Sequence, residues 1–362
     1  MIDWSESMQR TYEYYKVDPN TWKDTQRITN VKSCTIDRDL EVDTLGSAAI
    51  DVTESVGECY IRVYLVAVQN GLTEKVPLGT FLVQTPASDY NGKIRNVSMD
   101  AYTPLLELKE NQPPIGYYVP KKEKDFNGNE VDTNLMDMAY RLTRENLRAP
   151  VAKPNCSTKL NYDFVADTSD TWFSFLNDLI ANANYIFGLD EMSRILFVPR
   201  QDTASLQPVW TYNDDNSSIL YPELSMEHDL YGIPNVVEVI YFDGENHYYS
   251  KVVNDDPNSP TSTVTRGREI VYRVTEPDII GVPTQDQLDE YTTQLLRDLS
   301  SIEYTIKYTH GYCPVRLGDC VRLNYSRAGL SNIKAKVIRQ SIKCTPGCPV
   351  TETAVFTTKL WG

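Results

Sequence analysis

The strongest constraint on the fold is a pair of Asn-Gly dipeptides, each lying between two stretches that have strand character. Residues 58–69 alternate between two faces before Asn70–Gly71, and residues 76–84 follow that turn. Asn91–Gly92 then leads into residues 93–102. Asn and Gly both tolerate the positive φ angles that a two-residue hairpin turn requires. Three strands joined by two such turns predict an antiparallel meander rather than a βαβ unit.

The middle of the chain changes to a helical period. Thr133 is a candidate N-cap for a helix that places Leu135, Met138 and Leu142 on one face and ends before Pro150. Apolar residues recur at spacings of three and four between Trp172 and Ala183, which predicts a second helix. This stretch is therefore predicted to be an α+β insertion, bounded by residues 111–205.

From residue 206 the pattern is again typical of strands, with one interruption. Thr284 and Gln287 match a capping box, which predicts a helix near 284–300. The fold class is therefore mainly β with an α+β insertion. We divide the chain into an N-terminal arm (1–24), a first β domain (25–110), the insertion (111–205) and a second β domain (206–362).

The N-terminal arm is rich in large aromatic side chains and lacks an obvious local core. We therefore predict that it is laid over another surface and contributes an interface. The predicted interface residues are Trp4, Tyr12, Tyr14, Tyr15 and Trp22.

The net charge of −15 argues against tight nucleic-acid binding, because an acidic surface repels phosphates. No run of apolar residues is long enough for a membrane-spanning helix, and the start of the chain lacks the pattern of a secretory signal. We therefore expect no membrane span, and synthesis in a reducing cytoplasm, which the seven scattered cysteines also favour.

Motifs for metal, nucleotide or nucleophilic chemistry are absent from the sequence, so we expect neither an enzyme nor a cofactor. His228, His247 and His310 are interpreted as surface or packed residues. One alternative is a zinc site, since thiolates are good zinc ligands. Its candidate ligands are two pairs of cysteines, Cys313 with Cys320 and Cys344 with Cys348, although neither pair has the usual spacing of a zinc knuckle. A pair of carboxylates for glycan hydrolysis also remains open.

Distinctive strand-like segments lie in residues 27–53, which include the run from Ser33 to Leu40, in 78–83 and 99–106, in 315–321 with its Gly318–Asp319 pair, and in the final β segment that ends at Trp361. Together these segments resemble the hub proteins of phage tails and baseplates, including the N-terminal hub region of tail-associated lysins. The similarity covers nearly the whole chain as a pattern.

The resemblance implies two tube-like antiparallel β-barrels flanking the insertion. It also implies a homotrimeric ring at the distal tip of the tail, which adapts a sixfold tail tube to a threefold tip and lines the DNA channel. The implied partners are the tail tube or distal tail protein, the tape-measure protein and a spike or fibre, and DNA passes without specific binding. The alternatives are a sixfold distal or receptor-binding tail component and a cell-wall glycan hydrolase of the tail tip.

Overall fold

The computed structural model describes residues 2–54, 56–92, 94–124, 128–215, 218–242, 244–277, 279 and 282–361. Contacts between Cα atoms divide the chain into two compact units. Unit 1 comprises Met1–Glu223 and Tyr308–Thr353, and unit 2 comprises Leu224–Lys307 and Ala354–Gly362. The mainly β class predicted from the sequence is confirmed by the strands described below.

The first β block of unit 1 is antiparallel throughout. The two residues of the first turn have positive φ angles, Asn70 at 50° and Gly71 at 77°, as a tight hairpin requires. The predicted meander is therefore confirmed, although Lys93 lies outside the described residues. Its strands are β1 (Gln9–Val17), β2 (Asp24–Ile28), β3 (Val31–Asp39), β4 (Gly46–Val52), β5 (Tyr60–Gln69), β6 (Leu72–Asn91) and β7 (Ile94–Tyr102).

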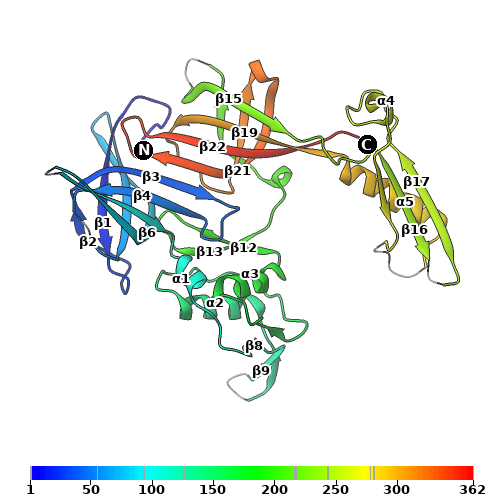
Figure 1. Ribbon diagram of the computed structural model, residues 1–362, viewed down its shortest axis with the longest axis horizontal. Coiled ribbons are helices and arrows are strands. Elements are labelled where there is room, and N and C mark those ends of the chain that lie inside the picture. The colour runs from blue at the N-terminus through cyan, green and yellow to red at the C-terminus, as the bar shows by residue number, and fades with distance from the viewer. Residues whose placement is uncertain are drawn as a thin grey trace. The chain divides into compact units, whose positions relative to one another are not determined.

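The second β block joins the same sheet. Its strands are β14 (Pro208–Asn213), β15 (Leu220–His228), β19 (Ser301–Gly311), β20 (Cys320–Tyr325), β21 (Leu330–Lys343) and β22 (Pro349–Lys359), with short 3-10 turns at Thr203–Ser205 and Ser326–Ala328. The resulting 13-stranded sheet has the order β15-β19-β22-β21-β3-β4-β7-β6-β5-β1-β2, and a branch, β14-β20, pairs with β21. Pairing of β21 with β3 unites the two β blocks (Figure 1).

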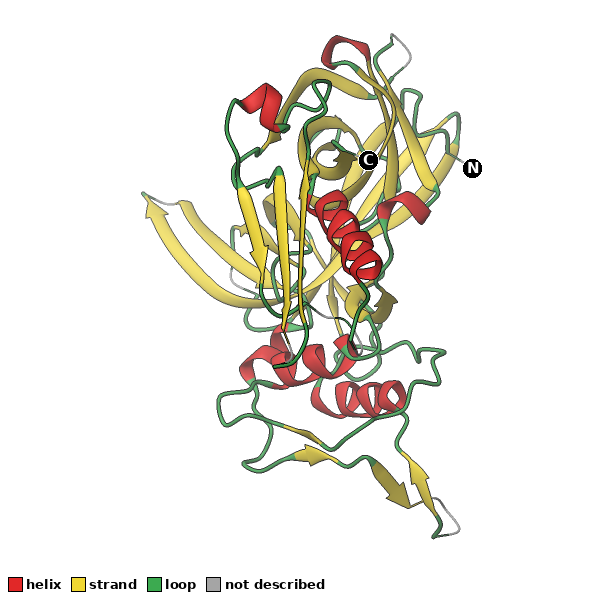
Figure 2. Cartoon of the chain, turned by 90° about the vertical axis from the view of Figure 1, so that its right-hand side faces the viewer, coloured by secondary structure: helices red, strands yellow, loops and turns green. Residues whose placement is uncertain are grey.

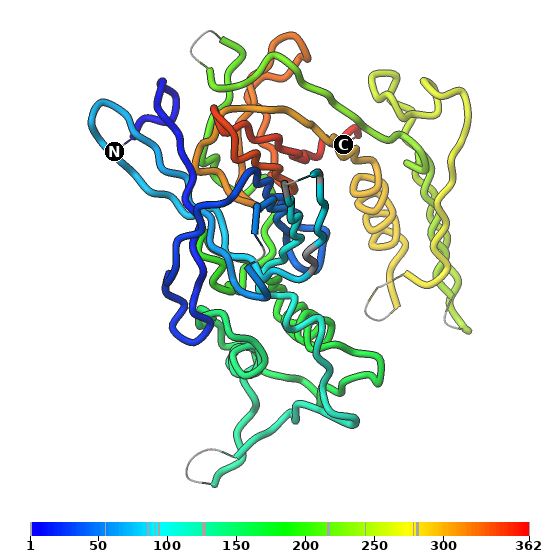
Figure 3. The backbone as a smooth tube through the Cα atoms, turned by 60° about the vertical axis from the view of Figure 1, so that its left-hand side comes forward, coloured from blue at the N-terminus to red at the C-terminus, as the bar shows by residue number. Residues whose placement is uncertain are grey.

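The predicted N-terminal arm is part of this sheet. β1 pairs with β5 along its whole length, from Gln9 opposite Val68 to Val17 opposite Tyr60. The backbone N–H of Asp3 donates to Gln69 at 2.9 Å, and the Gln69 amide donates back to the Asp3 carbonyl at 2.9 Å. Figure 3 shows this terminus beside the β5–β6 hairpin. Residues 1–24 thus differ from the expected arm, because their pairing partner lies about fifty residues further along the chain.

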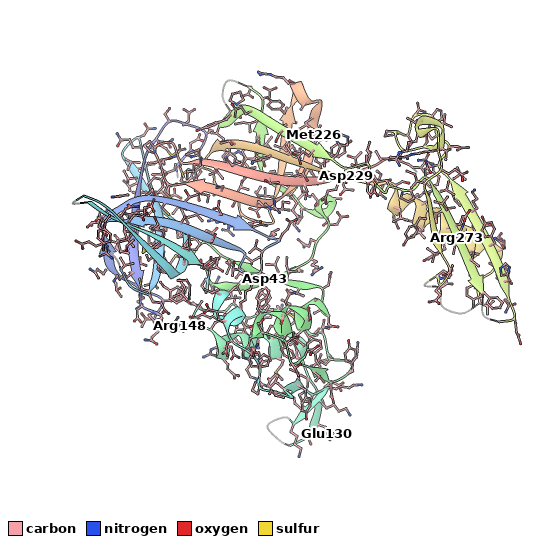
Figure 4. The ribbon with its side chains drawn as sticks, viewed as in Figure 1. Asp43, Glu130, Arg148, Met226, Asp229 and Arg273 are labelled. Carbon is pink, nitrogen blue, oxygen red and sulfur yellow. The ribbon has the colours of Figure 1, made fainter. Side chains whose placement is uncertain are left out.

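The helical insertion has a hydrophobic core of its own within unit 1. It contains α1 (Leu106–Glu110), α2 (Leu135–Asn146), α3 (Trp172–Ala181), and the short strands β8 (Tyr118–Val119), β9 (Lys122–Lys124), β10 (Glu130–Asp132), β11 (Phe164–Val165), β12 (Tyr185–Leu189) and β13 (Ile195–Pro199). The three helices lie side by side in Figure 1, and Glu130 lies far from the sheet, near the tip of the insertion, in Figure 4. Leu135, Met138 and Leu142 are buried in this core, as the helical period predicts.

Two contacts hold the insertion against the sheet. The Ser193 hydroxyl, in the turn between β12 and β13, accepts from the Thr80 backbone N–H at 2.8 Å. Arg148, labelled in Figure 4, pairs with Glu107 of α1 at 2.5 Å and lies over the Tyr60 ring at 5.2 Å. Ser193 and Arg148 therefore attach the insertion to strands β6 and β5 of the first β block.

The helix caps differ slightly from the predicted positions. Asn134, rather than Thr133, caps α2 by accepting from the backbone N–H groups of Met136 and Asp137. Thr171 caps α3 with a complete capping box. An Asn side chain satisfies N-terminal N–H groups as well as Thr does, so the sequence leaves the cap uncertain by one residue.

Unit 2 is a small α+β unit. Its residues were predicted to belong to the second β domain (206–362), but they form a separate compact unit. It contains β16 (Val236–Phe242), β17 (His247–Val253), β18 (Val271–Val274), α4 (Thr263–Arg266) and α5 (Gln285–Leu299). The strands form a sheet of order β17-β16-β18, and α5 packs along it (Figure 2). The predicted helix near 284–300 and its Thr284 capping box are confirmed. Asp243 lies outside the described residues.

Candidate functional site

A row of polar side chains crosses four neighbouring strands inside unit 1. The order is His310 on β19, Glu352 on β22, Gln340 on β21 and Arg38 on β3. The His310 Nε2 atom lies 3.3 Å from Glu352 Oε1, and the Gln340 amide donates to the same oxygen at 2.7 Å. Arg38 Nη1 donates to the Gln340 Oε1 atom at 3.1 Å. We call these four residues the buried polar row.

Three members of the row are removed from solvent. His310 and Glu352 are both 0% exposed, and Gln340 is 3% exposed. A buried carboxylate is unfavourable unless its oxygens are hydrogen-bonded. The Tyr308 hydroxyl donates to Glu352 Oε2 at 2.8 Å, and the Tyr212 hydroxyl lies 3.3 Å from the same oxygen. Both carboxylate oxygens therefore have donors.

The neighbours of the row fix the protonation state of His310. Its Nδ1 atom lies 2.6 Å from the Gly311 carbonyl oxygen, so Nδ1 is a donor. Burial lowers the pKa of His310, but the Glu352 charge and hydrogen bonds to Cys313 and Glu352 outweigh it and raise the pKa to about 10. For Glu352, burial raises the pKa, and His310, Gln340 and Tyr308 together bring it below its ordinary value. The two groups form an ion pair at neutral pH.

The row carries one more positive charge than negative. Arg38 and His310 are cations and Glu352 is the anion, because an Arg side chain keeps its proton inside proteins. Arg38 forms no ion pair with a carboxylate of the described residues. This excess charge lies at the end of the row that Arg38 occupies.

Cys313 completes an arrangement that has the residue types of a nucleophilic site. Its Sγ atom lies 3.8 Å from His310 Nδ1 and 3.2 Å from the Tyr212 hydroxyl. A nucleophile has to meet its substrate, and Cys313 is only 2% exposed, like the His and Glu beside it. The arrangement can stabilise the strands, but a substrate has no access to it in this conformation.

The four cysteines proposed as zinc ligands lie in different surroundings. Cys313 belongs to the surroundings of the row, and Cys320 Sγ lies 3.8 Å from the Val321 carbonyl. Cys344 contacts Cys34 on the adjacent strand, and Cys348 contacts Tyr12. Across the described residues, no three His, Cys, Asp or Glu side chains are arranged to hold a metal ion.

Three of the five aromatic residues predicted as an interface contact the interior of unit 1. Trp4 is 7% exposed and its ring meets Tyr312 edge-to-face at 5.2 Å. Tyr14 is 8% exposed and contacts Cys34 and Cys344. Tyr12 is half-buried, and its hydroxyl donates to the Thr345 carbonyl at 2.8 Å.

Tyr15 and Trp22 lie on the other face of the sheet. Tyr15 is half-buried, and the Lys75 ammonium lies 4.2 Å from the centre of its ring. Trp22 is also half-buried, donates from its indole N–H to Met192 at 3.0 Å, and meets Tyr60 edge-to-face at 4.9 Å. These five residues therefore do not form one exposed surface, and Trp4 and Tyr14 have little area left for a partner.

The described part of the chain contains no helix that is both long and apolar enough to span a membrane. No family model matches the chain, and no curated protein matches its sequence.

Two solved structures resemble this chain over almost its full length. The tail protein from Neisseria meningitidis MC58 has a TM-score of 0.60 at 13% identity, over 97% of this chain and 98% of that chain. The 43 kDa tail protein of prophage MuSo2 from Shewanella oneidensis has a TM-score of 0.59 at 10% identity, over 96% of this chain and 98% of that chain. The resemblance to phage tail proteins that the sequence predicts is confirmed in three dimensions, and the chain has the fold of these two tail proteins.

Proposed function

We propose that this chain is a structural component of a phage tail, namely the hub at the distal tip. The observation that carries the proposal is the shared fold with the Neisseria tail protein over 97% of the chain. In this proposal three copies form a ring, their β blocks form tube-like barrels, and the ring adapts a sixfold tube to a threefold tip.

The interior of unit 1 supports a structural role. The residues most typical of catalysis, His310 and Glu352, are completely buried and bonded to one another. Because β21 pairs with β3, each copy contributes both β blocks to a ring as parts of one sheet. A structural, non-enzymatic protein needs this continuity and needs no open cleft.

The partners and the location follow from the same proposal. The ring contacts the tail tube or distal tail protein, the tape-measure protein and a spike or fibre. It lies at the tail tip of the virion after synthesis in the cytoplasm of a bacterial host. A net charge of −15 for each copy repels DNA phosphates, so the genome passes the ring without adhering. A ring structure with a basic channel would contradict this role of the charge.

The proposal keeps an interface at the N-terminal segment, with fewer of the five predicted aromatic residues. Tyr12, Tyr15 and Trp22 keep some exposed surface, whereas Trp4 and Tyr14 stabilise the fold. The substitution Tyr15→Ala should weaken ring formation more than it lowers the unfolding temperature. Unchanged ring assembly would exclude Tyr15 from the interface.

The mass of the purified assembly tests the proposed ring. Native mass spectrometry should detect a species of three times 41.3 kDa, either alone or with a tail-tube partner. A sixfold species would favour the distal tail or receptor-binding component, and a strict monomer at all concentrations would contradict a self-assembling hub.

The enzyme alternative has its own test. The chain should leave peptidoglycan and surface polysaccharide intact in a zymogram, with lysozyme as the positive control. Clearing of the gel that disappears with a single Asp or Glu substitution would identify a glycan hydrolase instead.

A further inference from the structure

A cavity of about 370 Å³ lies within unit 1, where the end of β3, the hairpin β12–β13 and the loop before β20 meet. Its volume falls within the range of about 300–1,000 Å³ that is typical of ligand sites. Seven aliphatic side chains line it and remain only half-buried, so apolar surface is left uncovered there. They are Leu40, Leu45, Ile186, Leu189, Leu196, Leu206 and Leu317.

Arg38 lies at this cavity and is the last member of the buried polar row. Its guanidinium donates to two neutral oxygens, the Leu78 carbonyl at 2.7 Å and the Gln340 amide at 3.1 Å. A guanidinium carries more donors than these two bonds use. No carboxylate of the described residues lies within ion-pair distance of Arg38, and the Glu191 and Glu352 charges act on it only from a greater distance.

The carboxylates that line the cavity either form ion pairs with other arginines or have a raised pKa. Asp190 pairs with Arg194 at 3.0 Å, and Glu191 pairs with Arg316. Asp319 accepts from the Arg316 backbone N–H at 2.8 Å, and burial raises the pKa of Asp319, which disfavours its charged form. Lys336 adds a further positive side chain to the lining.

The cavity therefore combines uncovered aliphatic surface with a cation that has no carboxylate partner. Burial of aliphatic surface stabilises a bound apolar chain. Arg binds a carboxylate with two parallel hydrogen bonds, and it does so more strongly where water is excluded. An anion at Arg38 would also offset the excess positive charge of the row.

We propose that this cavity binds an aliphatic monocarboxylate, with the carboxylate on Arg38 and the hydrocarbon chain against the seven aliphatic side chains. The ligand is held by charge at one end and by apolar contact along its length. The proposal does not depend on the tail function, because it rests on the cavity and Arg38 alone.

Calorimetric titration of the full chain with octanoate tests the proposal. Octanoate should bind to one site, whereas acetate, which lacks the chain, and octanol, which lacks the charge, should bind at least tenfold more weakly. Arg38→Met should weaken octanoate binding at least tenfold. Arg339→Met is the matched control, because Arg339 is exposed, pairs with Asp39 and Glu41 on the surface, and does not line the cavity. This variant should bind as the unchanged chain does.

A second variant keeps the test decisive if Arg38→Met fails to fold. Leu206→Trp fills the cavity from a half-exposed loop position and leaves Arg38 in place. It should abolish octanoate binding. Absence of binding to the unchanged chain, equal binding of octanol, or undiminished binding by a folded Arg38→Met or Leu206→Trp variant would each overturn the proposal.

Discussion

Removal of the charge on Glu352 should destabilise unit 1 strongly. Glu352→Gln keeps the shape of the side chain but leaves His310 without its anion in a site that is 0% exposed. Loss of one partner of a buried ion pair costs about 3–5 kcal/mol. The proton on His310 gives a second measure of the pair. The rise in its pKa from 6.5 to about 10 corresponds to about 5 kcal/mol, at about 1.4 kcal/mol for each pH unit. Both routes give a loss of several kcal/mol.

The same pair predicts how stability depends on pH. The folded-state pKa of His310 lies above its unfolded value, so its proton stabilises the fold fully below about pH 6.5. That contribution is lost as the pH rises through about 10. The pKa of Glu352 is lowered, so its contribution is present above about pH 4.5 and is lost as the pH falls through its folded-state value. Burial raises the pKa of Tyr212 and of Tyr308 well above the ordinary value of 10, so both stay protonated between pH 6 and pH 9 and do not contribute to the difference between those two pH values.

Guanidinium unfolding followed by tryptophan fluorescence, at pH 6 and at pH 9, measures both effects. The unchanged chain should be markedly more stable at pH 6. Glu352→Gln should lose about 3–5 kcal/mol at pH 6 and lose most of the difference between the two pH values. Glu223→Gln, at an exposed position of β15, is the control and should resemble the unchanged chain. A loss below about 1 kcal/mol in Glu352→Gln, or an unaltered pH dependence, would refute the ion pair.

Three further predictions concern the sheet of unit 1. Gly46→Ala should cost roughly 1–3 kcal/mol in thermal unfolding, because φ is +149° and the new Cβ would lie 2.5 Å from the Asp37 carbonyl oxygen; an unchanged unfolding temperature would contradict it. Deletion of residues 2–17 should abolish folding of unit 1, since β5 loses one of its two partner strands over nine residue pairs, and circular dichroism showing a folded sheet would contradict it. Glutathione disulfide should oxidise Cys34 and Cys344 to a disulfide, with release of two reduced glutathione molecules, because Cys344, which directly follows β21, contacts Cys34 of β3. Peptide mass analysis should detect that link, and a glutathione adduct alone would contradict it.

The parts of the fold that the sequence predicts well are those that neighbouring residues determine. Asn70 and Gly71 supply the positive φ angles of a hairpin, and the turn brings together strands that follow one another. Thr284 and Gln287 likewise form their capping box within one turn of helix. Such features need no partner from elsewhere in the chain.

The place of the N-terminal segment in the sheet cannot be predicted from neighbouring residues, because its partner strand lies elsewhere in the chain. Tyr12 and Tyr14 point to one face of β1, and Glu13 and Tyr15 to the other, as in any strand. However, the pairing with β5 that gives these aromatic residues a core is distant in sequence. The sequence also does not predict unit 2 as a separate unit. The boundaries between the two units fall inside β15, β19 and β22, where the strand pattern has no break.

One member of the buried polar row can be recognised from the sequence pattern. Along β22 the buried positions are Val350, Glu352, Ala354 and Phe356, so a Glu occupies an inward position between apolar ones. Period-two alternation identifies it as a buried carboxylate that requires a partner. The sequence could not predict which residue that partner is, because His310 and Gln340 approach it only through the strand order.

The row has a consequence for how the two β blocks fit together. A slip of β22 by one residue would turn Glu352 outward and leave the His310 charge unpaired in the interior, at a cost of several kcal/mol. Buried ion pairs add little stability compared with apolar packing, so their clearer effect here is on register. Three members of the row belong to the second β block, and Arg38 belongs to the first. The row therefore fixes the alignment of β19, β22, β21 and β3 across the boundary between the two β blocks.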